Sequence, residues 1–455
     1  MAVGGRGVPG ADGRPIDWVL GPVQRFLRIE AAGGFLLLGC TAIALIWANS
    51  PWRESYDTLW HTSMSLGFGE HTLELSLAHF VNDGLMAIFF FVVGLEIKRE
   101  LMVGELASFR QAAVPFAAAV GGMVVPALIY FAINPGGGDS QGWAIPMATD
   151  IAFAVGIMAM LGKRVPLALK VFVIALAIVD DIGAVLVIAI FYTAEISTPA
   201  LLGALALLAV AFIAGRLGIR SALVYAIIGF FMWNMLLTSG VHATIGGVLL
   251  ALTIPSKVRI KGARFAAFAR ESVDAFEQSG GNQDEIMTNP KAMRAVQGLE
   301  IACEHVQTPL SRLEHGLHPW VATLIMPLFA LANAGVYLGE GFGDAVGSGV
   351  AAGVGLGLVV GKPAGVLLFT LLAVKLGLGQ LPAGTNWKQM FGAGCLAGIG
   401  FTMSLFIANL AFRGEDEAGL LLLAKAGILC ASLVAGVVGF LTLRAAGKVD
   451  VEATP

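Results

Sequence analysis

The sequence predicts an all-α membrane protein that crosses the bilayer many times. Of its 455 residues, 57% are hydrophobic and only 13% are charged, against about 25% charged residues in an average soluble domain. The apolar residues form runs of about 20, which suits helices that span a bilayer and not the alternating strands of an outer-membrane barrel. A net charge of −3 provides no basic surface for a nucleic acid, so no such partner is expected.

Twelve apolar segments are predicted to span the membrane. They cover about residues 31–49, 77–97, 112–134, 143–162, 167–193, 199–215, 221–237, 240–255, 318–338, 346–374, 389–411 and 418–443. With the N-terminus in the cytoplasm, the connections on that side contain 23 of the 28 Lys and Arg residues, and those on the outer side contain only Arg53 and Arg413. Because cytoplasmic connections retain positive charge, this asymmetry supports twelve spans with both termini in the cytoplasm.

The predicted organisation is a single transmembrane domain at 31–445. A cytoplasmic extension at 1–30 precedes it and a cytoplasmic tail at 446–455 follows it. Within the domain, residues 256–317 form a long cytoplasmic loop with eight basic and eight acidic side chains. We expect this loop to be a solvated linker, with a polar and mobile middle near 279–289.

The outer loop at 51–76 has a different pattern. Apolar residues alternate with polar ones at 64–68 and again at 73–77, with Gly67 and Gly69 near the first run. Alternation of this kind around glycines is typical of a short β-hairpin. A periplasmic hairpin is therefore expected here.

Charged residues inside the apolar segments are the strongest functional signal. A charge at the bilayer centre costs at least about 2.5–3.5 kcal/mol, and most of the predicted spans contain none. The exceptions are Asp83, Asp150, Asp180, Asp181 and Lys362. Their positions predict a polar site in the middle of the membrane.

Asp180 and Asp181 are adjacent near the middle of an apolar segment of about 27 residues. Neighbouring residues on a helix point about 100° apart, so one carboxylate can face a cavity while the other meets a partner. Burial and mutual repulsion make at least one of them able to exchange a proton near neutral pH. The alternative is a neutralised pair that only holds helices together.

Two of the predicted spans carry signs of interruption. Pro146 removes a backbone donor shortly before Thr149 and Asp150, and the segment 392–402 contains four glycines. A broken helix in each half of the chain points to a transport site where half-helices cross. For the second segment, a glycine-rich packing face is the alternative.

Lys362 needs a counter-ion, and an intramembrane aspartate is the natural one. The surrounding Gly-Lys-Pro is not a phosphate-binding loop, because Leu356 and Pro363 stand where Gly and Ser or Thr are required.

The chain has no nucleotide-binding motif, metal-ligand cluster or nucleophile–base pair, so neither an enzyme nor a cofactor is expected. Carboxylates and a Thr hydroxyl suit a hard cation and also exchange protons. The sequence therefore predicts a cation/proton exchanger; a sodium-coupled symporter of an organic anion and a passive cation channel are the alternatives.

Five motifs together resemble the bacterial NhaA-type sodium/proton antiporters. They are ATDIAFA at 148–154, VDDIG at 179–183, GVHAT at 240–244, GKP at 361–363 and GIGFTMSLFI at 398–407. The resemblance extends over about residues 30–445. It implies electrogenic, pH-regulated exchange of Na⁺ or Li⁺ for protons across the inner membrane, by alternating access, in support of pH homeostasis and salt tolerance. It also implies inverted repeats, for which this family is a known example.

The resemblance assigns roles to the intramembrane residues. Asp180 and Asp181 would bind the cation and the protons, and Lys362 would pair with Asp180. Thr149 and Asp150 would lie where the two interrupted spans, the fourth and the eleventh, cross. Two further expectations are that Asp83 is an accessory acid on the ion pathway and that the hairpin at 51–76 joins two protomers into a homodimer.

The resemblance also places pH sensing at the cytoplasmic side of the pathway. The matching residues are Glu96, Arg99, Glu100, Glu314, His315 and His318. Ordinary charge next to the membrane is the alternative, and for His242 a structural role competes with sensing. The chain departs from the family pattern in its extended N-terminus, in the length of the loop at 256–317, and at Ser311, where a basic residue is common.

Overall fold

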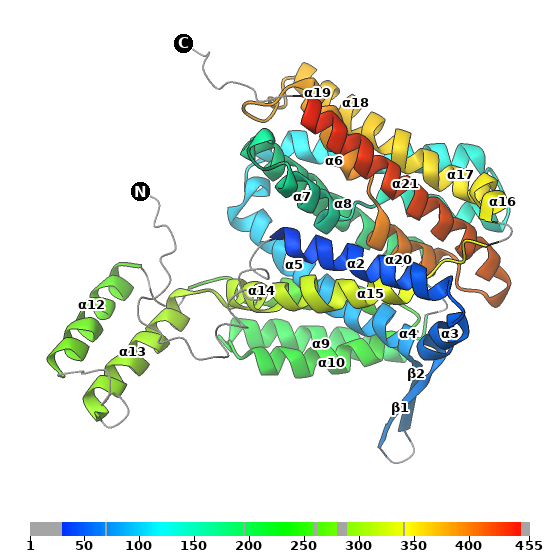
Figure 1. The fold of residues 1–455 in the computed structure, drawn as a ribbon. Coiled ribbons are helices and arrows are strands. Elements are labelled where there is room, and N and C mark those ends of the chain that lie inside the picture. Colours follow the sequence, from blue (N-terminus) through cyan, green and yellow to red (C-terminus); the bar gives the residue numbers. More distant parts are fainter. Residues whose placement is uncertain are drawn as a thin grey trace, which may run out of the picture.

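The computed structural model describes residues 30–446, except for 69–70, 194–195, 259, 261, 280–288 and 340–341. The predicted N-terminal extension and C-terminal tail therefore lie almost entirely outside the described residues. The described chain folds into a bundle of helices (Figure 1). Eight helices are long and apolar enough to cross a bilayer, and ten are if each of two bent helix pairs counts as one span. This confirms a multi-pass helical membrane protein. The count of twelve stays a prediction, because α10 (Ala222–Leu237) and α11 (Ala243–Thr253) are shorter apolar helices.

The helices pack in two groups. In Figure 1 the first group lies mainly below the second. The first group contains α2 (Glu30–Ala48), α4 (Leu77–His79), η1 (Phe80–Leu85), α5 (Met86–Val103), α9 (Thr198–Arg216), α10, α11, α14 (Pro309–Trp320), η5 (Val321–Ile325) and α15 (Met326–Asn333). The second group contains α6 (Phe109–Ile133), η3 (Gly138–Met147), α7 (Ile151–Met160), α8 (Leu167–Phe191), α17 (Gly349–Leu356), η6 (Gly357–Gly361), α18 (Lys362–Lys375), α19 (Trp387–Ala397), α20 (Phe401–Ala411) and α21 (Ala418–Ala445). Short helices connect these elements: α3 (Arg53–His61), η2 (Glu105–Ala107), η4 (Gly162–Arg164), α16 (Phe342–Gly347) and η7 (Glu415–Glu417). The groups meet mainly where α2 lies along α7, and also where α5 meets α8 and α15 meets α20.

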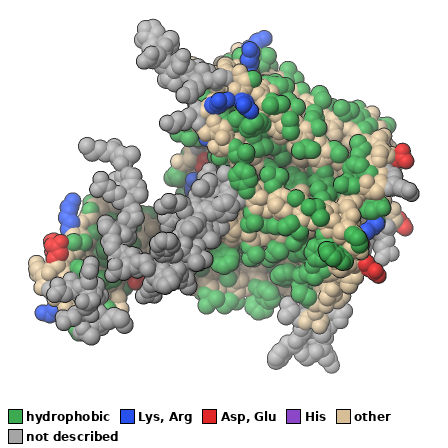
Figure 2. Space-filling model, viewed as in Figure 1, with side chains coloured by type: hydrophobic (Ala, Val, Ile, Leu, Met, Phe, Trp, Pro, Cys, Tyr) green, Lys and Arg blue, Asp and Glu red, His purple; other side chains and the backbone are tan. Residues whose placement is uncertain are grey.

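The surface of the bundle agrees with a lipid environment. Figure 2 shows a flank covered mainly by hydrophobic side chains, with charged side chains near the edges of the view. Large apolar residues are widely exposed on the helices; Ile46 is 70% exposed and Leu433 is also 70% exposed. In a soluble protein such a surface would promote association, whereas in a bilayer it faces lipid.

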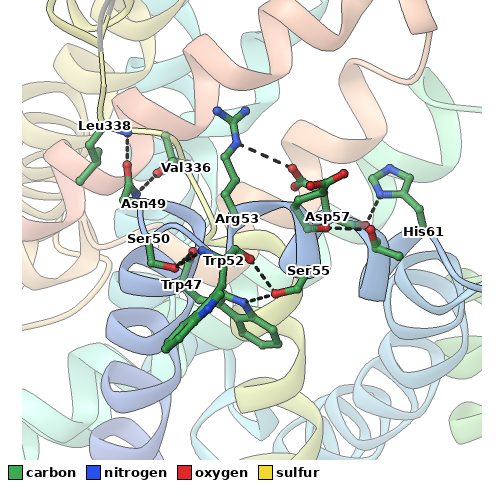
Figure 3. Close-up of polar contacts among 12 residues, drawn as sticks. Trp47, Asn49, Ser50, Trp52, Arg53, Ser55, Asp57, His61, Val336 and Leu338 are labelled. Carbon is green, nitrogen blue, oxygen red and sulfur yellow. Dashed lines mark hydrogen bonds and ion pairs between the residues drawn. The ribbon is translucent and has the colours of Figure 1, made fainter.

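The expected β-hairpin is present at one end of the bundle, which we call the hairpin end. Strand β1 (Ser63–Phe68) pairs with β2 (His71–Ser76) in antiparallel register, with Ser63 opposite Ser76. The first part of the predicted loop instead forms α3, which turns away from α2 by 114°. Figure 3 shows the bend: the Asn49 amide donates to the Val336 carbonyl at 2.8 Å and accepts from the Leu338 N–H at 2.6 Å.

The long loop at 256–317 differs from the expected linker. It contains α12 (Gly262–Gln278) and α13 (Pro290–Val306), which pack against each other, and the first part of α14. Asn289 caps α13 by accepting from the N–H groups of Lys291 and Ala292. Both helices project away from the bundle at the end opposite the hairpin, which we call the loop end (Figure 1). The middle of the loop that we expected to be mobile lies mostly outside the described residues.

Close packing of α6 against α18 depends on two facing glycines. A methyl group at Gly121 would overlap the backbone carbonyl of Gly365, and one at Gly365 would overlap the carbonyl of Gly121. Small residues allow membrane helices to approach this closely, and the approach is what gives them packing energy in lipid. Because α18 begins at Lys362, this contact also fixes the position of the intramembrane lysine.

We predict that Gly365→Ala separates α18 from α6 and lowers the unfolding temperature in detergent, because neither backbone can move aside freely. Overpacking of this kind costs about 1–3 kcal/mol. Gly355→Ala is the matched control, since a methyl group there meets nothing within 4 Å. Equal unfolding temperatures for the two variants would contradict the close contact.

Candidate functional site

Two of the apolar helical segments are broken at the same depth, and the breaks touch. In the first, the 3-10 helix η3 ends at Met147 and α7 begins at Ile151, which leaves 148–150 non-helical. In the second, α19 and α20 are separated by 398–400 and bent by 42°. The Asp150 N–H donates to the Ile399 carbonyl at 2.7 Å. Backbone groups that the breaks leave unpaired therefore satisfy each other, as a site inside a membrane requires.

Local sequence explains why the second break forms. A side chain at Gly398 would overlap the Leu358 carbonyl, and one at Gly400 would overlap the Ser404 side chain. The backbone overlap at Gly398 favours glycine there, and glycine also weakens a helix by about 0.5–1 kcal/mol relative to alanine.

Asp150 caps two helices at once. Its Oδ1 accepts from the Phe153 N–H at 3.2 Å, at the start of α7, and its Oδ2 accepts from the Thr402 N–H at 3.1 Å, at the start of α20. The Thr402 hydroxyl also donates to Oδ2. Helix starts carry about half a positive charge each. A single carboxylate that is 1% exposed therefore compensates two facing helix ends.

Lys362 contacts the C-terminal end of η3, where the helix has free carbonyl groups. Its ammonium lies 2.6 Å from Asp180 Oδ2 and also donates to the carbonyl of Met147, the last residue of η3. The lysine is fully buried. The structure thus brings Lys362 and Asp180 together, as the sequence predicts, and adds a carbonyl partner that the sequence did not reveal.

Thr149 joins the same cluster from the first break. Its hydroxyl is 2.8 Å from Asp180 Oδ2 and 2.8 Å from the carbonyl of Ala397, the last residue of α19. One hydroxyl proton can be donated to only one of these acceptors at a time. Thr149 therefore connects both breaks to α8, which carries Asp180.

Asp180 and Asp181 leave buried oxygens without partners. Each side chain is 1% exposed, and the Oδ1 atom of each has no hydrogen-bond partner in the described chain. Burying an unsatisfied polar atom costs about 1–3 kcal/mol, and more for a charged group. A monovalent cation or a proton would relieve this cost. Donor chemistry and burial therefore fit a cation that binds in competition with protons.

Asp83 lies apart from these residues, near the hairpin end. It is in the π-helical segment η1, where Oδ2 is 2.7 Å from His79 Nε2 and Oδ1 is 3.3 Å from His242 Nε2. His242 also caps α11, because its Nδ1 accepts from the Thr244 N–H. A structural role for His242 is therefore visible in the structure, whereas its predicted sensing role is not tested.

The predicted pH-sensing residues fall into two sets. Most meet at the loop end: Arg99 lies 3.1 Å from Glu314 and 3.2 Å from Glu100, and His318 lies 3.9 Å from Glu96. His315 does not join them, because it is exposed and bonds to Ser311 within its own helix.

Glu96 is the member of this cluster whose negative charge acts on Asp181.

Sequence reasoning missed Thr402 as a site residue. Its motif was recognised, but nothing in the sequence shows that it reaches Asp150, which is 252 positions away. A threonine just after a glycine-rich break is the signal that could have suggested a helix start there.

Comparisons with known proteins agree with this geometry. A family model described as "Na+/H+ antiporter 1" matches residues 24–443. The chain belongs to the NhaA family of Na⁺/H⁺ antiporters. A protein named Na(+)/H(+) antiporter NhaA from Oleidesulfovibrio alaskensis is 50% identical over 437 residues, 96% of each chain. Another of that name from Koribacter versatilis is 52% identical over 429 residues, 94% of this chain and 92% of the relative. This NhaA-family chain is accordingly a transporter and not an enzyme.

We predict that Lys362→Met destabilises the protein by about 3–5 kcal/mol, because it leaves the buried Asp180 carboxylate without its counter-ion. Adding Asp180→Asn should recover part of the loss, since the lone charge is then removed. Unfolding temperatures of the four proteins in this cycle provide the measurement. Additive losses in the double variant would show that the two side chains do not form a pair.

Proposed function

We propose that this chain exchanges Na⁺ or Li⁺ for protons across the bacterial inner membrane. Family membership supports Na⁺/H⁺ exchange in general. The observation that carries the specific mechanism is the pair of unpartnered oxygens on Asp180 and Asp181, buried between two broken helices. Either a dehydrated cation or a proton satisfies them, so the two compete for one place. The proposed exchange needs only the residues of this site and uses no cofactor.

Alternating access follows from competition at a buried site. The carboxylates are 1% exposed, so ions reach them only when the surrounding helices move. Protons leave toward one side, the cation binds, the helices rearrange, and the cation leaves toward the other side. Exchange is electrogenic when more protons than cations move in each cycle.

The proposed topology has twelve spans with inverted repeats, of which the fourth and eleventh are interrupted and cross. The touching breaks at 148–150 and 398–400 support this topology. The excess of Lys and Arg at the loop end supports cytoplasmic termini and a periplasmic hairpin end. The short helices α10 and α11 would then be membrane spans as well.

Regulation by pH is proposed for the loop-end cluster of Glu96, Arg99, Glu100, Glu314 and His318. His318 lies 3.9 Å from Glu96, and the negative charge of Glu96 acts on Asp181. Protonation at the cluster would therefore change the electrostatic potential at Asp181.

A homodimer through the hairpin is also proposed. In the described chain β1 and β2 pair only with each other, so each has a free edge that can pair with another protomer.

Transport by everted membrane vesicles tests the function. Vesicles from antiporter-deficient bacteria are energised, and an acridine dye reports the proton gradient while Na⁺, Li⁺ or K⁺ is added at several pH values. We expect Na⁺ and Li⁺ to collapse part of the gradient in the wild type but not in Asp181→Asn. Asp344→Asn is the matched control, because Asp344 is exposed and is not one of the buried residues of the site.

Two outcomes would overturn parts of this proposal. A correctly inserted wild type that responds to no cation at any pH would reject exchange and favour the symporter. Full activity of Asp181→Asn would keep exchange but remove Asp181 from the site.

A further inference from the structure

Three asparagines form a partly buried amide cluster near the hairpin end. Asn333, at the end of α15, donates to Asn82 at 2.7 Å, and Asn409, in the last turn of α20, donates to Asn333 at 2.8 Å. Asn333 is only 4% exposed and donates also to the Phe329 carbonyl at 3.0 Å. Neither the exchange chemistry nor the predicted pH sensor uses these residues.

The cluster lies across the boundary between the two helix groups. Asn82 and Asn333 belong to the first group, through η1 and α15, whereas Asn409 belongs to the second group, through α20. The hydrogen bond from Asn409 to Asn333 therefore ties one group to the other. Figure 1 shows α15 and α20 at the same side of the bundle as the hairpin.

Helix α20 carries this tie to the transport site. It starts beside Asp150, which accepts from Thr402, and Asn409 follows seven residues later, about 10 Å along a helix. A movement of α20 that breaks the amide contact must also move the helix start that Asp150 compensates. The amide contact and the ion site are thus coupled through one rigid element.

Aromatic side chains pack near the amide contact, between α20 and the first group. Phe406, one turn before Asn409 on α20, is fully buried against side chains of the first group. Its ring centroid lies 5.2 Å from that of Phe90, 5.6 Å from that of His242 and 6.2 Å from that of Phe329. Phe406, Phe90 and Phe329 are each 0% exposed, so solvent does not reach this contact between α20 and the first group.

We propose that Asn333 and Asn409 are positioning residues of the transport cycle: their hydrogen bond latches α20 against the first helix group and keeps the hairpin end closed. The inference rests on the proposed exchange function and adds the contact that separates its two access states. Opening toward the hairpin end requires the bond to break and Phe406 to leave its aromatic neighbours.

The contact is built to open at small cost. When α20 moves away, Asn333 keeps its bonds to Asn82 and to Phe329, which lie in its own group. Asn409 loses its acceptor, and Asn333 Oδ1 keeps the longer contact from the Asn82 amide, at 3.5 Å. Hydrogen bonds between membrane helices contribute modestly, because separated groups find other partners. A latch of this strength biases the equilibrium without locking it.

Population arithmetic gives the expected effect of removing the latch. Loss of the bond should change the ratio of closed to open states by about three- to five-fold. The apparent KM for a ligand is inversely proportional to the fraction of protein that can bind it. For Asn409→Ala, the KM for Na⁺ presented at the hairpin end should therefore fall by up to about five-fold, and the KM at the loop end should rise less than two-fold.

The experiment measures Na⁺/H⁺ exchange in right-side-out and everted vesicles, which present opposite ends to the medium. Asn134→Ala is the matched control: Asn134 is a buried asparagine that bonds to the carbonyls of Tyr130 and Gly349, both within the second group. Its loss can lower the unfolding temperature but should leave the ratio of the two KM values unchanged. Asn333→Ala and the double variant with Asn409→Ala should shift the ratio no further than Asn409→Ala alone.

The outcomes distinguish a failure of the proposed exchange function from a failure of the latch. A wild type without cation exchange overturns the proposed function. A wild type that exchanges, with Asn409→Ala showing an unchanged KM ratio or a parallel change at both ends, overturns the latch alone. Additive shifts in the double variant would also contradict it, because both residues would then act through separate contacts.

Discussion

The ion pair between Lys362 and Asp180 is the constraint on which the site depends. A charge in the middle of a bilayer is costly and is almost always paired with an opposite charge or a backbone carbonyl. Lys362 is fully buried and bonds to Asp180 and to the last carbonyl of η3. That carbonyl is available only because the helix is broken there, and the break in turn creates the positive helix start that Asp150 compensates. The buried charges and the broken helices therefore depend on each other.

The sequence predicts this arrangement well at residues that are unusual in a membrane-spanning segment. Charges in apolar segments and a Pro or Gly within a span each contradict a strong physical preference, so Asp180, Lys362 and Pro146 are conspicuous without any structure. Which partners they meet is harder. The residues alone predict an intramembrane aspartate as the partner of Lys362, and only the family resemblance selects Asp180 from the four that the sequence offers. The Met147 and Ala397 carbonyls were not predictable, because every residue has a carbonyl and only the crossing of the chains selects these two.

Elsewhere the sequence left the structure open. The α12–α13 pair was expected to be a linker, because its mixed charges resemble those of a solvated segment; its apolar positions form helical faces that pack only once both helices exist. The asparagine cluster was not predicted either. Asparagine is neutral and common, so Asn82, Asn333 and Asn409 do not stand out until the fold brings together three segments that are 251 and 76 positions apart.

Charge accounting around the site leads to one further step. Asp150 is balanced by two helix starts of about half a charge each, and Asp180 is balanced by Lys362. Asp181 remains, and one monovalent cation or one proton neutralises it. Exchange at Asp181 alone would thus move one charge each way and be electroneutral. If exchange is electrogenic, as proposed, a second proton must come from another group. Because Asp180 is adjacent to Asp181, our candidate is the pair of Lys362 and Asp180. Their contact must then break and re-form during each cycle, so the interaction that holds the site together is also a moving part of it.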